Sequence, residues 1–185
     1  MNLHDLPIDK SWTLFLDRDG VINRLRENDY VKNWSEFEFL PGAKESIRGF
    51  SDLFGRIIVV TNQQGIGKGI YTVEDLESIH LNMVLEVILS GGRIDRVYFA
   101  PQLEKEKSNM RKPNTGMAEK AAEDFPEINF EQSIIIGDST SDMEFGKRKG
   151  MKTILVGEKQ INPEDLSLID YRFQNLEKVW HSIKK

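Results

Sequence analysis

Short apolar runs alternate along the chain with longer segments in which apolar residues recur every three to four positions. The short runs are rich in β-branched residues and apolar on both sides, as in strands of a parallel sheet covered on both faces. They lie at 12–17, 56–61, 94–100, 133–138 and 152–157. The other segments predict helices near 42–53, 73–90, 116–124 and 141–149, and the tail predicts a short strand at 171–173 and a closing helix from Asn175. This alternation predicts an α/β three-layer sandwich with a parallel, Rossmann-like sheet.

The helix predicted at 73–90 has the clearest amphipathic pattern. Thr72 is a favourable N-cap residue, and two glycines follow the last turn, as at many helix ends. The predicted core-facing stripe consists of Val73, Leu76, Ile79, Met83, Val87 and Ile88.

Four polar motifs follow four of the predicted strands. The motif DRDG follows the first strand, TNQQGIGKG the second and GDSTSD the fourth, and RKPNTG lies in the connection after the third. In open parallel sheets, ligands bind beyond the carboxyl ends of the strands. The sequence therefore predicts that all four motifs meet at one edge of the sheet and form a binding site.

The first motif predicts a cluster of acids at a strand end. Asp17 and Asp19 project to the same side of an extended chain and Arg18 to the other, while Gly20 lets the chain turn. Two acids so close repel one another, and a bound cation is the natural way to keep one of them ionised. Asp138 supplies a third carboxylate from the fourth strand. Carboxylates without histidine or cysteine favour Mg²⁺.

The other motifs supply groups that bind a phosphoryl group. Thr61 and Asn62 offer a hydroxyl, an amide and backbone N–H groups, and Arg111 and Lys112 offer positive charge. In such a site one aspartate attacks phosphorus, and the second protonates the leaving oxygen and then activates water. Lys112 and the cation would neutralise the transition state. The sequence thus predicts a phosphomonoesterase.

Nearly the whole chain resembles the haloacid-dehalogenase-like phosphatases. The resemblance rests on FLDRDGVIN, VVTNQQGIGKG, RKP and IIGDSTSD, in that order. It implies that Asp17 is the nucleophile that forms an aspartyl-phosphate and that Asp19 is the general acid and base. The resemblance also implies that Thr61 and Asn62 bind the phosphoryl group and that Lys112 stabilises its charge. It implies that Asp17, Asp138 and the backbone carbonyl of Asp19 bind Mg²⁺, and that Asp142 supports Lys112 or the waters of the metal.

Within this superfamily the chain is similar to the heptose-1,7-bisphosphate 7-phosphatases and the related histidinol-phosphate phosphatases. The similarity rests on DRDGVIN, a downstream YV, FEFLPGA, TNQQGIGKG and RKPNTGM. It implies a small phosphorylated sugar as substrate and no large cap domain, so that only the insert at 23–41 and the loop at 100–111 can cover the site. Many relatives carry a zinc loop before RKP. Its four ligand positions are Ala100, Gln102, Ser108 and Met110 here, so no zinc is expected, and Ser139 replaces a frequent lysine.

Two alternative substrates stay open. Histidinol phosphate needs a wall that binds a cation, and Glu27 and Asp29 either form it or lie in a solvated loop. The polynucleotide 3′-phosphatases share parts of the second and third motifs, and a strand-binding groove would draw on Arg24, Arg26, Lys32, Lys105, Lys107, Arg111 and Lys112. The net charge of −5 argues against nucleic acid as a partner.

Length and composition predict a single phosphatase domain over residues 1–185. The chain has no cysteine, which excludes disulfides and thiolate metal sites. The first residues lack an apolar signal core, and no run approaches the ~18 apolar residues of a membrane span. We expect a cytoplasmic monomer without a membrane partner. His4, His80 and His181 are interpreted as surface or packing residues.

Overall fold

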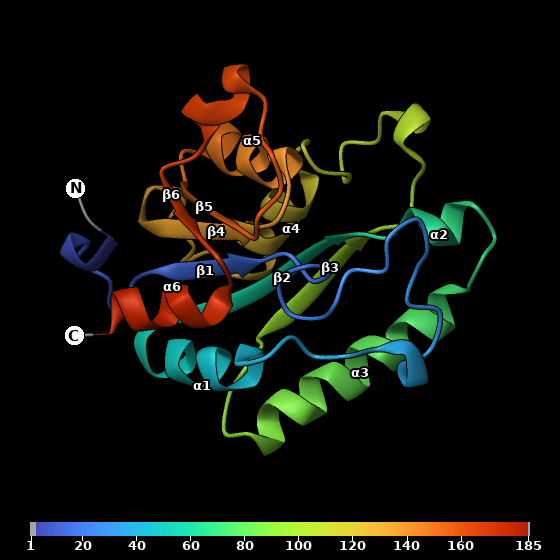
Figure 1. Cartoon of the computed structure of the whole chain (residues 1–185), viewed down its shortest axis with the longest axis horizontal. Coiled ribbons are helices and arrows are strands. Elements are labelled where there is room, and N and C mark those ends of the chain that lie inside the picture. Colours follow the sequence, from blue (N-terminus) through green and yellow to red (C-terminus); the bar gives the residue numbers. More distant parts are fainter. Residues whose placement is uncertain (1–2, 185) are drawn as a thin grey trace.

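The computed structural model describes residues 3–184 and contains one six-stranded parallel sheet. The strand order is β3-β2-β1-β4-β5-β6, so β1 lies in the middle of the sheet (Figure 1). The chain adds β2 and β3 on one side of β1, and the strand order then reverses, with β4, β5 and β6 added on the other side. The strands are β1 (Thr13–Leu16), β2 (Arg56–Asn62), β3 (Arg96–Ala100), β4 (Ser133–Gly137), β5 (Lys152–Val156) and β6 (Tyr171–Phe173). The loops after β1 and β4 diverge at this reversal, where parallel α/β sheets bind ligands.

Helices cover both faces of the sheet (Figure 1). One face packs against α1 (Ala43–Leu53), α3 (Val73–Leu89) and α6 (Leu176–Ile183), and the other against α4 (Gly116–Asp124) and α5 (Thr140–Lys149). Along β1, Leu14 and Leu16 enter the first core and Phe15 the second, because successive side chains of a strand alternate between faces. The predicted α/β three-layer sandwich is confirmed.

The predicted elements agree with the structure to within two residues at their ends, including the short strand β6 and the closing helix with its N-cap Asn175. One short helix, α2 (Gln64–Gly67), lies inside the second polar motif and was not predicted. The stripe on α3 was wrong at its end. Ile88 is 54% exposed because Val87, four residues after Met83, takes the core-facing position and the next residue rotates by about 100° toward solvent.

Two connections lie over the carboxyl edge of the sheet in place of a large cap. The insert at 23–41 contains one three-residue 3₁₀ helix at Trp34–Glu36. The ring of Trp34 stacks on Phe37, Phe39 meets Phe37 edge-on, and all three rings pack on the core. The loop at 100–111 contains another at Glu104–Glu106. None of the helices in residues 3–184 is both long enough and apolar enough to cross a bilayer.

Candidate active site

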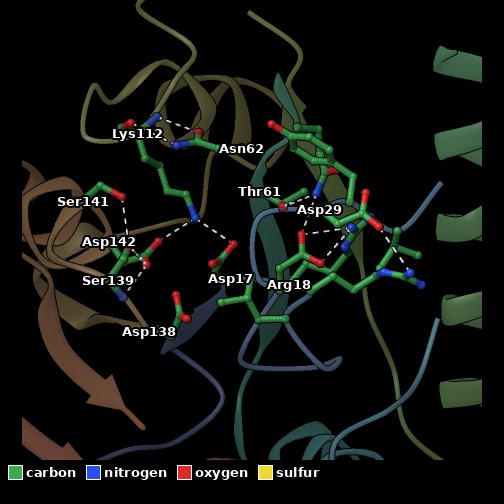
Figure 2. Close-up of a pocket in the computed structure, with 16 residues that line it drawn as sticks. Asp17, Arg18, Asp29, Thr61, Asn62, Lys112, Asp138, Ser139, Ser141 and Asp142 are labelled. Atoms are coloured by element: carbon green, nitrogen blue, oxygen red, sulfur yellow. Dashed lines mark hydrogen bonds and ion pairs between the residues drawn. The ribbon is translucent and has the colours of Figure 1, made fainter. Parts of the chain in front are cut away.

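A cavity at the carboxyl ends of β1, β2 and β4 collects side chains from all four polar motifs (Figure 2). Its volume is about 180 Å³. Arg111 faces an adjoining hollow and is the one predicted site residue that does not line the cavity. The predicted residues that line it are Asp17, Asp19, Thr61, Asn62, Lys112, Asp138 and Asp142. The four motifs therefore meet at one edge of the sheet, as the sequence predicts.

Lys112 is the central cation of this cavity. Its side chain is 2% exposed, and Nζ lies 2.9 Å from Asp17 Oδ1 and 2.6 Å from Asp142 Oδ1. Nζ also donates a hydrogen bond of 2.7 Å to the backbone carbonyl of Val60 on β2. Figure 2 shows the side chain reaching down between the two carboxylates. All three donors of the ammonium group are used, so its position is fixed before any ligand binds.

Burial and neighbouring charges act in opposite directions on the pKa values of Asp17 and Lys112. Burial raises the pKa of Asp17 to about 7, although the charge of Lys112 opposes the shift. Burial would lower the pKa of Lys112, but the charges of Asp142 and Asp17 outweigh it and raise that pKa above its ordinary value. Lys112 therefore stays charged, whereas Asp17 needs further positive charge to be fully ionised at neutral pH.

Asn62 fixes the loop that carries Lys112. Its Oδ1 accepts a hydrogen bond of 3.0 Å from the Lys112 backbone N–H, and its Nδ2 donates one of 3.0 Å to the Lys112 carbonyl. This two-way pairing is a positioning role that the sequence did not indicate for Asn62. Thr61 is buried, and its hydroxyl accepts from Gln63 Nε2 at 2.9 Å, which leaves the hydroxyl proton available to an oxygen atom in the cavity.

Three carboxylates form a group that suits a metal ion. Asp17, Asp138 and Asp142 each offer an oxygen atom, and these atoms all lie within 4.8 Å of one another. Hard oxygen donors without nitrogen or sulfur fit Mg²⁺. The Asp19 carboxylate is not part of this group, in keeping with the resemblance, which assigns the metal to its backbone carbonyl.

Two neighbours of Asp138 explain its placement. A Cβ atom at Gly20 would lie 2.3 Å from Asp138 Oδ2, and φ of Gly20 is +83°, so only glycine fits beside this carboxylate. Lys159, in the loop after β5, places Nζ 2.6 Å from the same oxygen. Burial raises the pKa of Asp138, and the hydrogen bond from Lys159 opposes the shift. Sequence analysis did not identify Lys159, because no motif marks the loop at 157–161.

Asp19 is held by donors on both of its oxygen atoms. Arg18 Nη2 lies 2.9 Å from each oxygen, Asn23 Nδ2 lies 2.9 Å from Oδ1, and Gln63 Nε2 lies 2.8 Å from Oδ2. Burial would raise the pKa of Asp19, but the charge of Arg18 and these hydrogen bonds lower it below its ordinary value. Asp17 and Asp19 thus share a cavity but lie in opposite environments. The carboxylate of Asp19 is stabilised and that of Asp17 is not.

His80 contacts the active site through Arg18. The side chain of Arg18 is 1% exposed, and its Nη1 lies 3.2 Å from His80 Nε2 on α3. His80 fits its interpretation as a packing residue in that it is buried, but that interpretation missed this polar contact. Its position one residue after Ile79 and three before Met83, both on the buried side of α3, was the signal available in the sequence.

The insert forms one wall of the cavity. Asp29 and Tyr30 line it, whereas Glu27 does not. The carboxylate of Asp29 is paired with Lys32 at 2.8 Å and with Arg26 at 3.2 Å. The acidic wall considered for a cationic leaving group is therefore already neutralised within the loop.

The binding of Mg²⁺ at this acidic group is expected to depend on pH. Because burial raises the pKa of Asp17 to about 7, a proton occupies this carboxylate below that pH and must leave when the metal binds. We expect affinity to fall about tenfold per pH unit below about pH 7 and to be nearly constant above about pH 8. Titration calorimetry in buffers of different ionisation enthalpy measures both the affinity and the proton released. The Asp17→Asn variant is the control and should lose this dependence; constant affinity in the unaltered protein across that range would contradict the expectation.

Comparison with known proteins agrees with the geometry. Residues 109–179 match a family model described as HAD-hydrolase-like. The chain is 34% identical over 176 residues to the D-glycero-alpha-D-manno-heptose-1,7-bisphosphate 7-phosphatase of Campylobacter jejuni, covering 95% of this chain and 98% of the relative. It is 40% identical over 133 residues to the enzyme of the same name from Mycobacterium bovis, covering 72% and 70% of the two chains.

A solved structure of the D,D-heptose 1,7-bisphosphate phosphatase from B. bronchiseptica, complexed with magnesium and phosphate, is also similar. Its TM-score is 0.79 at 25% identity, with 92% of this chain and 96% of that chain covered. The chain matches the Campylobacter jejuni relative over nearly its full length. It is therefore a phosphoric monoester hydrolase that belongs to the haloacid-dehalogenase-like superfamily, in the family of the heptose-1,7-bisphosphate 7-phosphatases.

Proposed function

We propose that the chain is a Mg²⁺-dependent phosphatase that removes the 7-phosphate of D-glycero-D-manno-heptose 1,7-bisphosphate. The names of its relatives support this substrate. The observation that carries the proposal is a second cationic hollow directly beside the acid cluster, because a bisphosphate needs two anion sites within the length of one sugar.

The reaction follows from the positions of the charged groups. Asp17 attacks phosphorus, a bond forms between its carboxylate oxygen and phosphorus, and the bond from phosphorus to the sugar oxygen breaks. Asp19, which is ionised in the ligand-free cavity, takes up a proton as the anionic substrate binds and gives that proton to the sugar oxygen. A water molecule then attacks the aspartyl-phosphate, loses its proton to Asp19, and releases phosphate and the Asp17 carboxylate. Lys112 neutralises charge on the transferred group throughout, and the Thr61 hydroxyl donates to one of its oxygens.

A magnesium ion at Asp17, Asp138 and the backbone carbonyl of Asp19 would supply positive charge to the transferred phosphoryl oxygens. Asp142 stabilises the positions of Lys112 and Ser139. It pairs with Lys112, and its Oδ2 accepts hydrogen bonds from the Ser139 hydroxyl at 2.5 Å and the Ser139 backbone N–H at 3.2 Å. Asp142 thereby holds both the lysine and the start of α5 in place.

The second hollow has the character of an anion site. Its volume is about 460 Å³, and the cations Arg111, Lys107 and Lys112 line it against a single acid, Glu104, together with Ser108 and Asn114. It shares Asn62, Lys112 and Ser141 with the first cavity. The Nη1 atom of Arg111 is buried and has no hydrogen-bond partner among residues 3–184. A buried guanidinium donor without a partner is costly, and a phosphate oxygen would satisfy it.

Arg111→Met is expected to impair turnover of the bisphosphate but not of the 7-monophosphate. Removing a charged hydrogen bond to the 1-phosphate should lower kcat/KM for the bisphosphate ~10–100-fold, mainly through KM. The heptose 7-monophosphate has no group at that position, so its kcat/KM should change less than ~3-fold. Lys105→Met, at an exposed lysine of the same loop, is the matched control. An equal loss on both substrates would show that Arg111 does not bind the 1-phosphate.

The substrate itself is tested by Mg²⁺-dependent phosphate release from a panel. The panel contains both anomers of the heptose bisphosphate, histidinol phosphate and a 3′-phosphorylated oligonucleotide. We expect a preference of ~100-fold or more for the heptose, about 2.7 kcal/mol of transition-state discrimination. Faster turnover of histidinol phosphate or of the oligonucleotide would replace the proposed substrate, and slow, uniform rates would leave the phosphatase chemistry with another sugar phosphate.

We also propose that residues 1–185 act as one phosphatase domain and as a cytoplasmic monomer, without nucleic acid or membrane as a partner. The protein needs no zinc in this proposal, because the side chains of Ala100, Gln102, Ser108 and Met110 offer neither thiolate nor imidazole.

A further inference from the structure

Arg18 is the largest fully buried side chain of the described chain. A buried guanidinium group needs both an anion and hydrogen-bond acceptors to offset its desolvation. Asp19 is its anion, at 2.9 Å, and His80 is its second acceptor, at 3.2 Å. The Nε atom of Arg18 has no partner within residues 3–184. The orientation of the guanidinium plane therefore depends on Asp19 and His80.

His80 is suited to accept this hydrogen bond. Burial, together with the charge of Arg18, lowers the pKa of His80 to about 3, so the imidazole is neutral at physiological pH. A neutral imidazole has one acceptor nitrogen, and the contact to Arg18 Nη1 requires this to be Nε2. His80 is 7% exposed, and its ring lies beside Phe99 of β3, with ring centroids 6.0 Å apart.

A second arm reaches Asp19 from the other side. Gln63 Nε2 donates to Asp19 Oδ2 at 2.8 Å, and the hydroxyl of Tyr71 donates to Gln63 Oε1 at 2.5 Å. Tyr71 thereby fixes which end of the amide faces the carboxylate. With Asn23, each oxygen of Asp19 accepts two hydrogen bonds, so the carboxylate plane is restrained from both sides.

We infer that His80 is a positioning residue of the phosphatase reaction: it holds Arg18 in the orientation that fixes the carboxylate of Asp19. The inference rests on the proposed function, in which Asp19 transfers the proton to and from the reacting oxygens. Proton transfer requires a donor within hydrogen-bond reach in the correct direction. Without the acceptor at position 80, the guanidinium group can rotate, and Asp19 loses its fixed direction.

Two variants of matched size isolate the hydrogen bond. His80→Gln supplies an acceptor oxygen, whereas His80→Met has a similar length and offers only a weakly accepting thioether sulfur. The readout is kcat/KM on two substrates, the heptose bisphosphate, whose leaving alcohol needs a proton, and p-nitrophenyl phosphate, whose leaving phenolate does not. We expect His80→Met to lower kcat/KM for the sugar phosphate ~10–50-fold and for the aryl phosphate less than ~3-fold. His80→Gln should stay within ~3-fold of the unaltered protein on both.

The Asp19→Asn variant separates this inference from the proposed function. It should lose ~10²–10⁴-fold on the sugar phosphate and much less on the aryl phosphate. If Asp19→Asn loses as much kcat/KM on the aryl phosphate as on the sugar phosphate, the role of Asp19 itself is overturned. If Asp19→Asn behaves as expected, three results would overturn only the role of His80. These are a loss of kcat/KM in His80→Met that is equal on the two substrates, no loss in His80→Met, and a loss in His80→Gln as large as that in His80→Met.

A measurement on the unaltered protein keeps the test independent of variant folding. Nitrogen-15 spectra of the imidazole should show Nε2 without a proton and Nδ1 protonated, with no titration between about pH 5 and pH 9. The opposite tautomer, or protonation within that range, would overturn the inference.

Discussion

Asp17→Asn is expected to abolish turnover, lowering kcat by at least ~10⁴-fold, while the chain keeps its fold. Asparagine has nearly the shape of aspartate, but its amide cannot form the aspartyl-phosphate. Phosphate release measured with excess Mg²⁺ checks the rate, and circular dichroism checks the fold. Substantial residual activity would mean that another group attacks phosphorus.

The same substitution has an expected effect on stability that depends on pH. Burial raises the pKa of Asp17 to about 7 in the folded protein, above its value in the unfolded chain. Its ionisation therefore disfavours the folded state, a cost that is absent at about pH 4, grows as the pH rises to about 7 and is then constant. Without metal, Asp17→Asn should unfold at the same or a higher temperature than the unaltered protein at about pH 8, with a smaller difference at about pH 5. A lower unfolding temperature at pH 8 would show that the ion pair with Lys112 outweighs the burial.

Lys112→Met is expected to impair both catalysis and stability. The substitution removes the cation that faces the transferred phosphoryl group, so kcat should fall ~10³-fold or more. It also leaves Asp17 and Asp142 buried without their common counter-ion, which should lower the free energy of unfolding of the metal-free protein by about 3–5 kcal/mol. Urea denaturation measures this loss.

Added Mg²⁺ should restore part of the stability of Lys112→Met but not its rate. The ion can supply charge to the carboxylates, but it cannot take the place of an ammonium group bound to the Val60 carbonyl. Lys120→Met is the matched control, because Lys120 is an exposed lysine that also pairs with two acids, and its loss should cost less than ~1 kcal/mol. Similar losses in both variants would show that Lys112 is not an essential counter-ion of the cluster.

The sheet and the position of the site could be predicted because the signals for both are local. A run such as RIIVVT in β2 carries its strand propensity within itself, and the polar residues directly after a strand necessarily lie at its carboxyl end. The parallel order then brings Asp17, Thr61 and Asp138 together without knowledge of any side-chain contact.

The residues that were missed act through contacts between distant parts of the chain. Arg18 and His80 are 62 positions apart, and Asp138 and Lys159 are 21 apart. Neither partner of either pair reveals the other by composition or spacing. Asn62 was assigned to phosphoryl binding from its amide group and from the family resemblance. Its hydrogen bonds with the backbone of Lys112 appear only when the end of β2 and the connection after β3 are seen side by side.

This bond between Asn62 and Lys112 has an evolutionary consequence. Lys112 is anchored to β2 by the amide of Asn62 and by the carbonyl of Val60, and neither anchor involves the preceding loop at 100–111. Insertions, deletions or loss of a metal in that loop can accumulate without displacing the lysine. Such a loop can change what the enzyme binds while the residues that break the phosphate ester stay where they are, so substrate preference and bond cleavage are free to evolve separately in this fold.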